Sequence, residues 1–162
     1  KFMRKSFIAI IILLSISFTD VFSAEYNIYV SKVTDGDSIH GIYNGKKLKI
    51  RLLYIDAPEL KQPHGIKAKQ FLENMILDKD VTIVCQEKDF YGRELCEVFH
   101  YELNTPTYVN AKMIKSGNAW VYKSNRNNNY LINLENDAIS NQRGLWSDKN
   151  PLEPWVYRRS QK

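Results

Sequence analysis

Three short segments of the chain combine carboxylates, arginines and glycines at close spacing. They are TDGDS at residues 34–38, RLLYIDAPE at 51–59 and DFYGRE at 89–94. Carboxylates that lie close together repel each other and hold protons more tightly unless a cation lies between them. A hard cation such as Ca²⁺ takes oxygen ligands from carboxylates, main-chain carbonyls and water. The first two segments therefore contain the donor types of a site for a hard cation.

The aspartates of these two segments are predicted to lie side by side. Asp37 begins the strand-like segment DSIHGIY, and Asp56 ends the next strand-like segment, which starts with KKLKIRLLYI. Asn44-Gly45 between them favours a tight hairpin, because both central residues of a type I′ turn need positive φ. The far ends of the two strands then meet, and the aspartates with them.

Arg51 is predicted to leave the core face of its strand. Ile50 and Leu52 alternate with Lys49 and Arg51, so the two cations share the face opposite to the apolar side chains. The three histidines are scattered along the chain and form no cluster with the cysteines. This argues against zinc or copper and in favour of oxygen ligands.

Each of these charged residues also has a plain structural interpretation. Asp and Gly are common in turns, so TDGDS alone could be only a turn. Asp56 could precede the bend at Pro58, and Glu59 could be solvated. Arg51 could lie on the outside of a sheet, and Arg93 in a hairpin loop. Together these explanations are weaker, because the arginines and the acids are all predicted at one end of the same sheet.

The order of elements predicts one α+β domain built on a five-stranded OB-type barrel with three helices. Alternating apolar residues indicate strands at 26–33, 37–43, 46–55, 81–87 and 94–99. Apolar residues at helical spacing indicate helices at about 65–78, 108–118 and 130–142. Five strands with a helix between the third and fourth are typical of OB barrels, which commonly bind oligonucleotides. Residues 146–162 are expected to form an irregular tail.

Residues 1–23 have the layout of a secretory signal peptide, which leaves 24–162 as the mature domain. A basic start precedes the apolar run FIAIIILLSISF at 7–18, which is short for a membrane span of ~20 residues. We expect cleavage after Ser23 or Ala24, and an uncleaved anchor is the alternative. Removal of residues 1–23 takes away three basic residues and one acidic residue and lowers the net charge from +5 to +3, which is compatible with a polyanionic partner but does not require one.

The two cysteines are predicted to form a disulfide. A hairpin centred on KDFYGR aligns Cys85 with Cys96 and Ile83 with Val98, with both pairs facing inward. Facing positions in an antiparallel pair are close enough for a disulfide, which export would favour. The alternative is two buried free thiols.

The chain after residue 23 resembles the staphylococcal nuclease family over nearly all of its length. The likeness is carried by DGDS before a hairpin, RLLYIDAPE, QPHG before a helix, YGR in a later hairpin and GLW near the end. RLLxIDxPE with DGD upstream and YGR downstream is a specific combination. The ending GLWSDKNPLEPWVYRR is similar to the secreted bacterial branch of that family.

The resemblance implies an OB-fold nuclease that binds Ca²⁺. The family's calcium carboxylates match Asp37 and Asp56, and a third ligand, a main-chain carbonyl, matches Ala57. The family archetype has threonine where this chain has Ala57, so the carbonyl ligand is kept and a hydroxyl contact is lost.

The resemblance also implies the catalytic roles. Glu59 matches the general base, and Arg51 and Arg93 match the two phosphate-binding arginines. A phosphodiester resists attack by anions, and a divalent ion with two guanidiniums offsets the charge that develops on the phosphate. Side chains expected to contact the nucleotide along the groove are Tyr91, Tyr122 and Lys49. Phe90 stands where the archetype has a lysine near a terminal phosphate.

The expected protein is thus an exported nuclease, secreted or periplasmic, that acts on DNA and RNA without strong sequence preference. We expect a monomer with no obligate protein partner and no stable membrane association after signal cleavage. A catalytically weak OB module that binds nucleic acid is one alternative. A secreted structural domain that uses Ca²⁺ only for stability is another.

Overall fold

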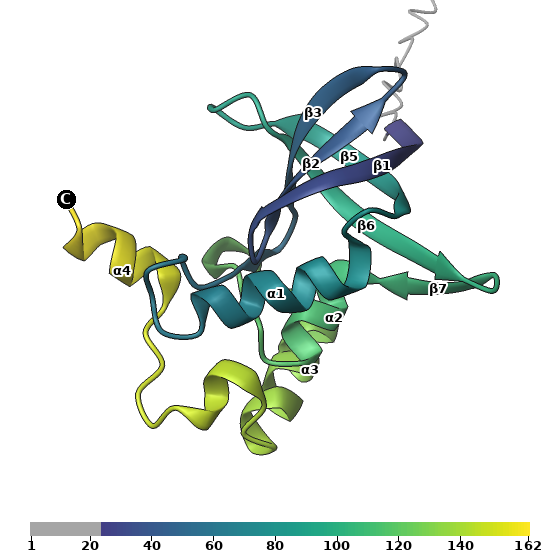
Figure 1. Ribbon diagram of the computed structural model, residues 1–162. Coiled ribbons are helices and arrows are strands. Elements are labelled where there is room, and N and C mark those ends of the chain that lie inside the picture. The colour runs from purple at the N-terminus through teal and green to yellow at the C-terminus, as the bar shows by residue number, and fades with distance from the viewer. Residues whose placement is uncertain (1–23) are drawn as a thin grey trace, which may run out of the picture.

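Five strands close into a barrel, which forms the upper part of the molecule in Figure 1. The computed structural model describes residues 24–162, so the predicted signal peptide lies outside the described residues. The barrel strands are β1 (Ala24–Asp35), β2 (Ser38–Tyr43), β3 (Lys46–Leu52), β5 (Asp80–Lys88) and β6 (Glu94–Glu102). Neighbours in the order β3-β2-β1-β5-β6 pair antiparallel, and β3 pairs in parallel with β6 to close the barrel. The predicted α+β OB-type barrel is confirmed.

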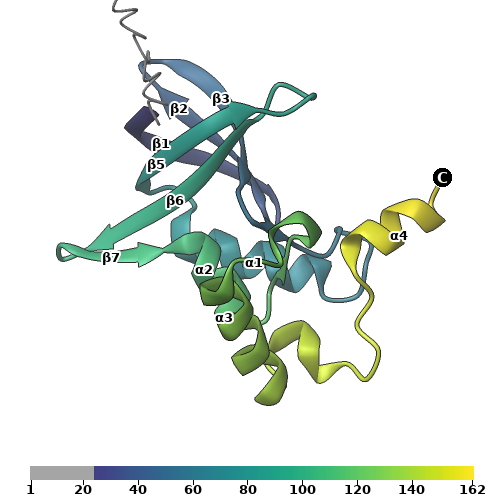
Figure 2. The ribbon, with the colours of Figure 1, turned by 180° about the vertical axis from the view of Figure 1, so that it is seen from behind.

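Three helices lie below the barrel in both views; two of them pack against barrel strands, and the third packs against the second (Figures 1 and 2). They are α1 (Gly65–Ile76), α2 (Val109–Lys115) and α3 (Asn129–Ser140). All three were predicted, with ends that differ by at most three residues. The short elements are β4 (Ile55–Asp56), β7 (Thr105–Tyr108), β8 (Trp120–Val121) and the 3₁₀ turns η1 (Lys123–Asn125) and η2 (Gly144–Ser147). No helix within residues 24–162 is long and apolar enough to cross a membrane.

The predicted irregular tail is wrong in one part. A fourth helix, α4 (Pro154–Ser160), follows a connection without regular structure. Proline at the first helical position has its φ already set for a helix, and Arg158 and Arg159 lie in the last turn, where cations are favourable. The helix has only seven residues, too short for an apolar period to be recognised in the sequence. Figure 1 places α4 beside the loop that leads into α1.

The predicted third strand is also interrupted. β3 ends at Leu52, and Tyr54 takes a positive φ of 68°, so the chain turns before the two-residue strand β4. β4 pairs with β8, which comes from the region between α2 and α3. Asp56 therefore lies on a separate short strand, and the pairing with β8 fixes its main chain.

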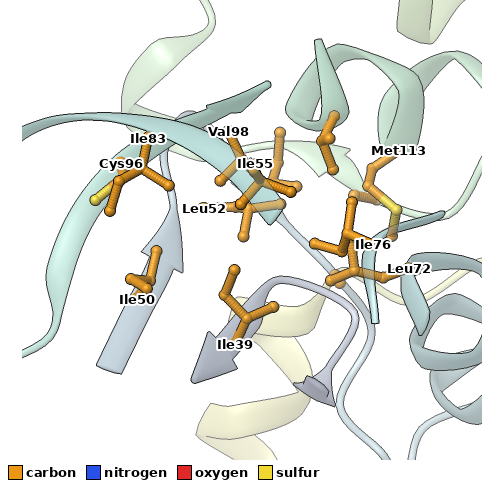
Figure 3. Close-up of a cluster of buried hydrophobic side chains, with 14 of the residues drawn as sticks. Ile39, Ile50, Leu52, Ile55, Leu72, Ile76, Ile83, Cys96, Val98 and Met113 are labelled. Carbon is orange, nitrogen blue, oxygen red and sulfur yellow. The ribbon is translucent and has the colours of Figure 1, made fainter. Parts of the chain in front are cut away.

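The core fills the barrel and the space between the barrel and the helices (Figure 3). Its barrel side chains include Ile39, Ile50, Leu52, Ile83 and Val98, and each of them is at most 1% exposed. From the helices come Leu72, Ile76 and Met113. Full burial of one such side chain contributes about 1.5–3 kcal/mol, so the strands that carry the charged residues form a rigid base.

The β5–β6 hairpin has the predicted alignment. Cys85 pairs with Cys96 and Ile83 with Val98, and all four side chains are buried. The structure contains a disulfide between Cys85 and Cys96. The hairpin turn at Asn44-Gly45 has positive φ at both residues, as a type I′ turn requires.

Candidate active site

The turn between β1 and β2 brings Asp37 to the segment that contains Asp56. The N–H of Asp37 donates to Asp35 Oδ1 at 3.0 Å, which fixes the turn. A Cβ atom added to Gly36 would lie 2.6 Å from the Cβ of Ala57, so only glycine permits this close approach. The approach lets the N–H of Ala57 donate to Asp37 Oδ2 at 2.6 Å. The DGD motif thus joins the two predicted segments directly.

Arg51 lies between the two aspartates. Its Nη1 is 2.9 Å from Asp37 Oδ2, and its Nη2 is 3.0 Å from Asp56 Oδ1. Nη1 also donates to the carbonyls of Leu52 at 3.2 Å and Ile55 at 3.0 Å, across the turn between β3 and β4. The predicted proximity of the aspartates is confirmed, and the guanidinium between them offsets their repulsion. The sequence placed Arg51 on the correct face of β3 but did not predict these carbonyl contacts.

Burial leaves the two aspartates with incompletely compensated charge. Asp37 is 6% exposed and Asp56 is 0% exposed. Burial raises the pKa of Asp37 to about 6, although the charge of Arg51 acts in the opposite direction. Burial also raises the pKa of Asp56 above its ordinary value, against a hydrogen bond from Arg158 and the charge of Arg51. Two such carboxylates favour a further positive charge between or beside them.

Glu59 is held by the loop that leads into α1. Its N–H donates to Gln62 Oε1 at 3.1 Å, and its carbonyl accepts from the N–H of Gln62 at 2.8 Å. A Cβ atom added to Gly65, the first residue of α1, would lie 1.9 Å from this carbonyl oxygen. The Glu59 side chain is 37% exposed, so a solvent water molecule can reach its carboxylate.

Arg93 reaches the same groove from the β5–β6 hairpin. Its Nε and Nη2 lie 2.8 Å and 2.7 Å from Asp89 Oδ2. Its guanidinium carbon lies 5.6 Å from the centre of the Tyr91 ring. Burial would raise the pKa of Asp89, but hydrogen bonds from the main chain and side chain of Arg93 lower it below its ordinary value. The hairpin loop therefore holds its arginine in a defined position before any substrate is bound.

One groove of about 840 Å³ collects nearly all of the predicted site residues. Those that line it are Asp37, Arg51, Asp56, Ala57, Glu59, Tyr91, Arg93 and Tyr122. Lys49 does not line the groove. It lies on the outer face of β3, two residues before Arg51 and opposite His40 of β2. The roles of these residues remain predictions, but the structure brings their side chains to one place.

The donors at the inner end of the groove fit a hard cation in their chemistry. The carboxylates of Asp37 and Asp56 and the carbonyl of Ala57 are oxygen ligands, and a bound cation would compete with Arg51 and Arg158 for the carboxylate oxygens that they contact in this structure. Within residues 24–162, no group of three or more His, Cys, Asp or Glu side chains is arranged to hold a metal. A cation here would therefore need main-chain or water oxygens in addition to the two carboxylates.

A residue that the sequence did not single out completes the site. Arg158 of α4 donates to Asp56 through both Nη atoms, at 3.1 Å and 2.7 Å. Its Nη1 also donates to Glu59 Oε1 at 2.8 Å. These carboxylates raise the pKa of Arg158 above its ordinary value, with the hydrogen bond to Asp56 as the largest cause. No local pattern could pair residues about one hundred positions apart, and the basic ending VYRR was the only signal in this part of the chain.

Comparison with known proteins gives the family. The model of a family described as "Staphylococcal nuclease homologue" matches residues 49–148. The chain belongs to the staphylococcal nuclease family. An "Uncharacterized endonuclease" of Escherichia coli O157:H7 is 37% identical over 139 residues, which cover 85% of this chain and 88% of the relative. A "Micrococcal nuclease" of Shigella flexneri is 35% identical over 147 residues, which cover 86% and 84%. A further "Uncharacterized endonuclease", of Haemophilus influenzae, is 37% identical over 134 residues, 82% of this chain and 73% of the relative.

The residues that match the staphylococcal nuclease family model include most, but not all, of the residues that line the groove. Arg51, Asp56, Glu59 and Arg93 lie within residues 49–148. The turn that carries Asp37 and the helix α4 lie outside the matched residues and join the groove through the contacts described above.

Proposed function

We propose that this protein is an exported, Ca²⁺-dependent nuclease that hydrolyses DNA and RNA with little sequence preference. The observation that carries the proposal is the groove itself, in which a solvent-accessible glutamate, two buried aspartates and two arginines converge. Membership of the staphylococcal nuclease family supports it, as do relatives named endonuclease and micrococcal nuclease.

Glu59 is the proposed general base. Its carboxylate takes a proton from a water molecule, whose oxygen attacks phosphorus as the bond to the 5′ oxygen breaks. The leaving oxygen takes a proton from solvent water, so the products carry a 3′-phosphate and a 5′-hydroxyl. Arg51 and Arg93 offset the charge on the phosphate oxygens, and their planar guanidiniums suit this because they pair with two oxygens at once.

Asp37, Asp56 and the carbonyl of Ala57 are the proposed ligands of Ca²⁺. When bound, Ca²⁺ supplies charge that stabilises the developing negative charge at the phosphate. The main-chain ligand is kept although the side chain at position 57 is only a methyl group. The two carboxylates are held before binding, because Arg51 contacts both of them.

A row of cations supports a polyanionic substrate. Lys47, Lys49 and Arg51 alternate along β3 and so project from the same face. Lys32 of β1 lies beside them, because it pairs with His40, which pairs with Lys49. Burial first, and then the charges of the three lysines, lowers the pKa of His40. A phosphate backbone that leaves the groove along β3 would meet these lysines.

Two tyrosines support contact with bases. Tyr91 is exposed on the hairpin loop, and Tyr122 also lines the groove, with its N–H donating to the carbonyl of Tyr54. Stacking on aromatic side chains is tolerant of sequence, because every base has a π-face. Little sequence preference follows from this kind of contact.

Export is proposed from the signal-like residues 1–23. The Cys85–Cys96 disulfide agrees with an oxidising compartment, because such bonds are rare in the cytosol. We propose release to the medium or the periplasm, and a monomer without an obligate protein partner.

Digestion of single-stranded DNA in Ca²⁺ and in a chelator tests the function. Cleavage in Ca²⁺ that the chelator abolishes is the expected result, and analysis of the new ends should give 3′-phosphates. Glu59→Gln should lower turnover by orders of magnitude while substrate binding stays largely intact. Binding without cleavage by the wild-type protein would support a nucleic-acid-binding OB module instead.

A further inference from the structure

The last helix is fastened to the element that carries Asp56. Trp155 of α4 lies 6.0 Å, centre to centre, from Trp120 of β8, and Trp120 pairs with Asp56 in the β4–β8 ladder. Pro154 is buried, and Gln62 Nε2 donates to the carbonyl of Leu152 in the preceding connection. These contacts bring α4 against both β8 and the loop of Glu59, so the placement of its side chains is determined by packing.

Arg158 connects two carboxylates that have different proposed roles. Nη1 of Arg158 donates to Asp56 Oδ1 at 3.1 Å, and Nη2 donates to Asp56 Oδ2 at 2.7 Å. Nη1 also donates to Glu59 Oε1 at 2.8 Å. Within the described residues, Arg158 is the only partner of the Glu59 carboxylate. Glutamate has a long side chain with several rotamers, and this one is partly exposed. Without Arg158, repulsion from the buried Asp56 would turn the Glu59 carboxylate away, toward solvent.

We propose that Arg158 is a positioning residue of the active site, which holds the Glu59 carboxylate in the groove beside Asp56. The inference rests on the proposed role of Glu59 as general base. Arg158 lines the groove, and we assign its effect to Glu59 because both of its Nη atoms contact carboxylates in the structure. The site is then complete only when α4 is docked, which assigns a function to the end of the chain beyond the part that matches the family model.

Kinetics of two substitutions test this inference, with a matched control on the same helix. Arg158→Ala should lower kcat about 10- to 100-fold with little change in KM, because a misplaced general base slows the chemical step. Arg158→Lys should recover part of the lost kcat, because lysine restores the positive charge but cannot donate to two oxygens through a planar guanidinium. Arg159→Ala removes a neighbouring cation that is exposed and has no ion pair within the described residues, and should leave kcat unchanged.

Chemical rescue separates positioning from general destabilisation. Added guanidinium at low concentration should raise the kcat of Arg158→Ala and leave Arg159→Ala and the wild type unaffected. Tryptophan emission should match the wild type if α4 stays docked through Trp155. Equal kcat values for Arg158→Ala and the wild type would overturn the inference, as would a loss in Arg159→Ala of the same size. Absence of cleavage by the wild type itself would instead overturn the proposed function.

Discussion

Asp37→Asn is expected to stabilise the metal-free protein at alkaline pH. Asp37 is buried, and burial raises its pKa from 3.8 to about 6. Asparagine has nearly the same shape as the protonated side chain, and its amide oxygen can still accept from the N–H of Ala57. The substitution therefore removes the cost of burying a charge and keeps the local hydrogen bond.

The size of the effect follows from the two pKa values. The difference between 3.8 and about 6 corresponds to about 3 kcal/mol of free energy of unfolding. The folded-state pKa is the higher one, so the favourable contribution of the protonated group is complete below pH 3.8 and is lost as pH rises through 6. At pH 8 the variant should be more stable by about 3 kcal/mol, a rise in Tm of about 6–12 °C. Near pH 4 the two proteins should unfold at nearly the same temperature.

Thermal unfolding in a chelator, measured between pH 4 and 8 by circular dichroism, gives these values. Excess Ca²⁺ should reverse the ranking at pH 8, because a ligand at a thousand times its Kd stabilises the protein that binds it by about 4.1 kcal/mol. Asp89→Asn is the control of opposite sign. The pKa of Asp89 is lowered by hydrogen bonds from Arg93, so its contribution is present at neutral pH and is lost as pH falls.

A metal-free Asp37→Asn protein that is less stable than the wild type at pH 8 would refute the reasoning. The ion pair of Asp37 with Arg51 would then outweigh the cost of burial. Equal Tm values with and without Ca²⁺ in the wild type would separately remove Asp37 from the proposed cation site.

Three further predictions concern Arg93, Gly65 and the disulfide. Arg93→Ala should cut catalysis by more than about 100-fold, the range for loss of a preorganised charge donor, and Arg93→Lys should restore only part of it in the same DNA digestion assay. Gly65→Ala should lower both Tm and activity, because its Cβ would overlap the carbonyl oxygen of Glu59; an unchanged Tm would contradict this contact. Reduction of the Cys85–Cys96 disulfide should cost about 2–3 kcal/mol of stability for a loop of this length. Mass spectrometry should find no alkylation of the native protein without reductant, and two added alkyl groups would reject the disulfide.

Most of the barrel follows from local patterns. Apolar residues alternate along each strand, and Asn44-Gly45 specifies a hairpin that brings Asp37 and Asp56 to one end. The Cys85–Cys96 alignment was predicted from the short loop that joins the two strands, and it holds although an irregularity between Cys85 and Glu87 shifts the pairing on the loop side by one residue. These features depend on interactions between residues that are close together in the sequence, so they can be predicted from the sequence alone.

The turn between β3 and β4 is the first place where local reasoning failed. The segment KKLKIRLLYI has strand composition throughout, but Tyr54 takes a positive φ. Arg51 contributes to this conformation, because it donates to the carbonyls of Leu52 and Ile55 on either side of the turn. The broken strand pairs with β8, and that partner is not visible in the sequence around Asp56.

The sequence by itself determined the barrel, the disulfide register and the set of acids and arginines that share one end of the molecule. Only the tertiary structure decided how these charges are paired. Arg51 is engaged by both aspartates, and Arg158 arrives from about one hundred residues further along the chain to hold Asp56 and Glu59. The physical reason is the separation along the chain between the residues that interact. Strand alternation and turn chemistry act between neighbours, whereas the position of α4 depends on the packing of Trp155 against Trp120, which exists only in the folded chain.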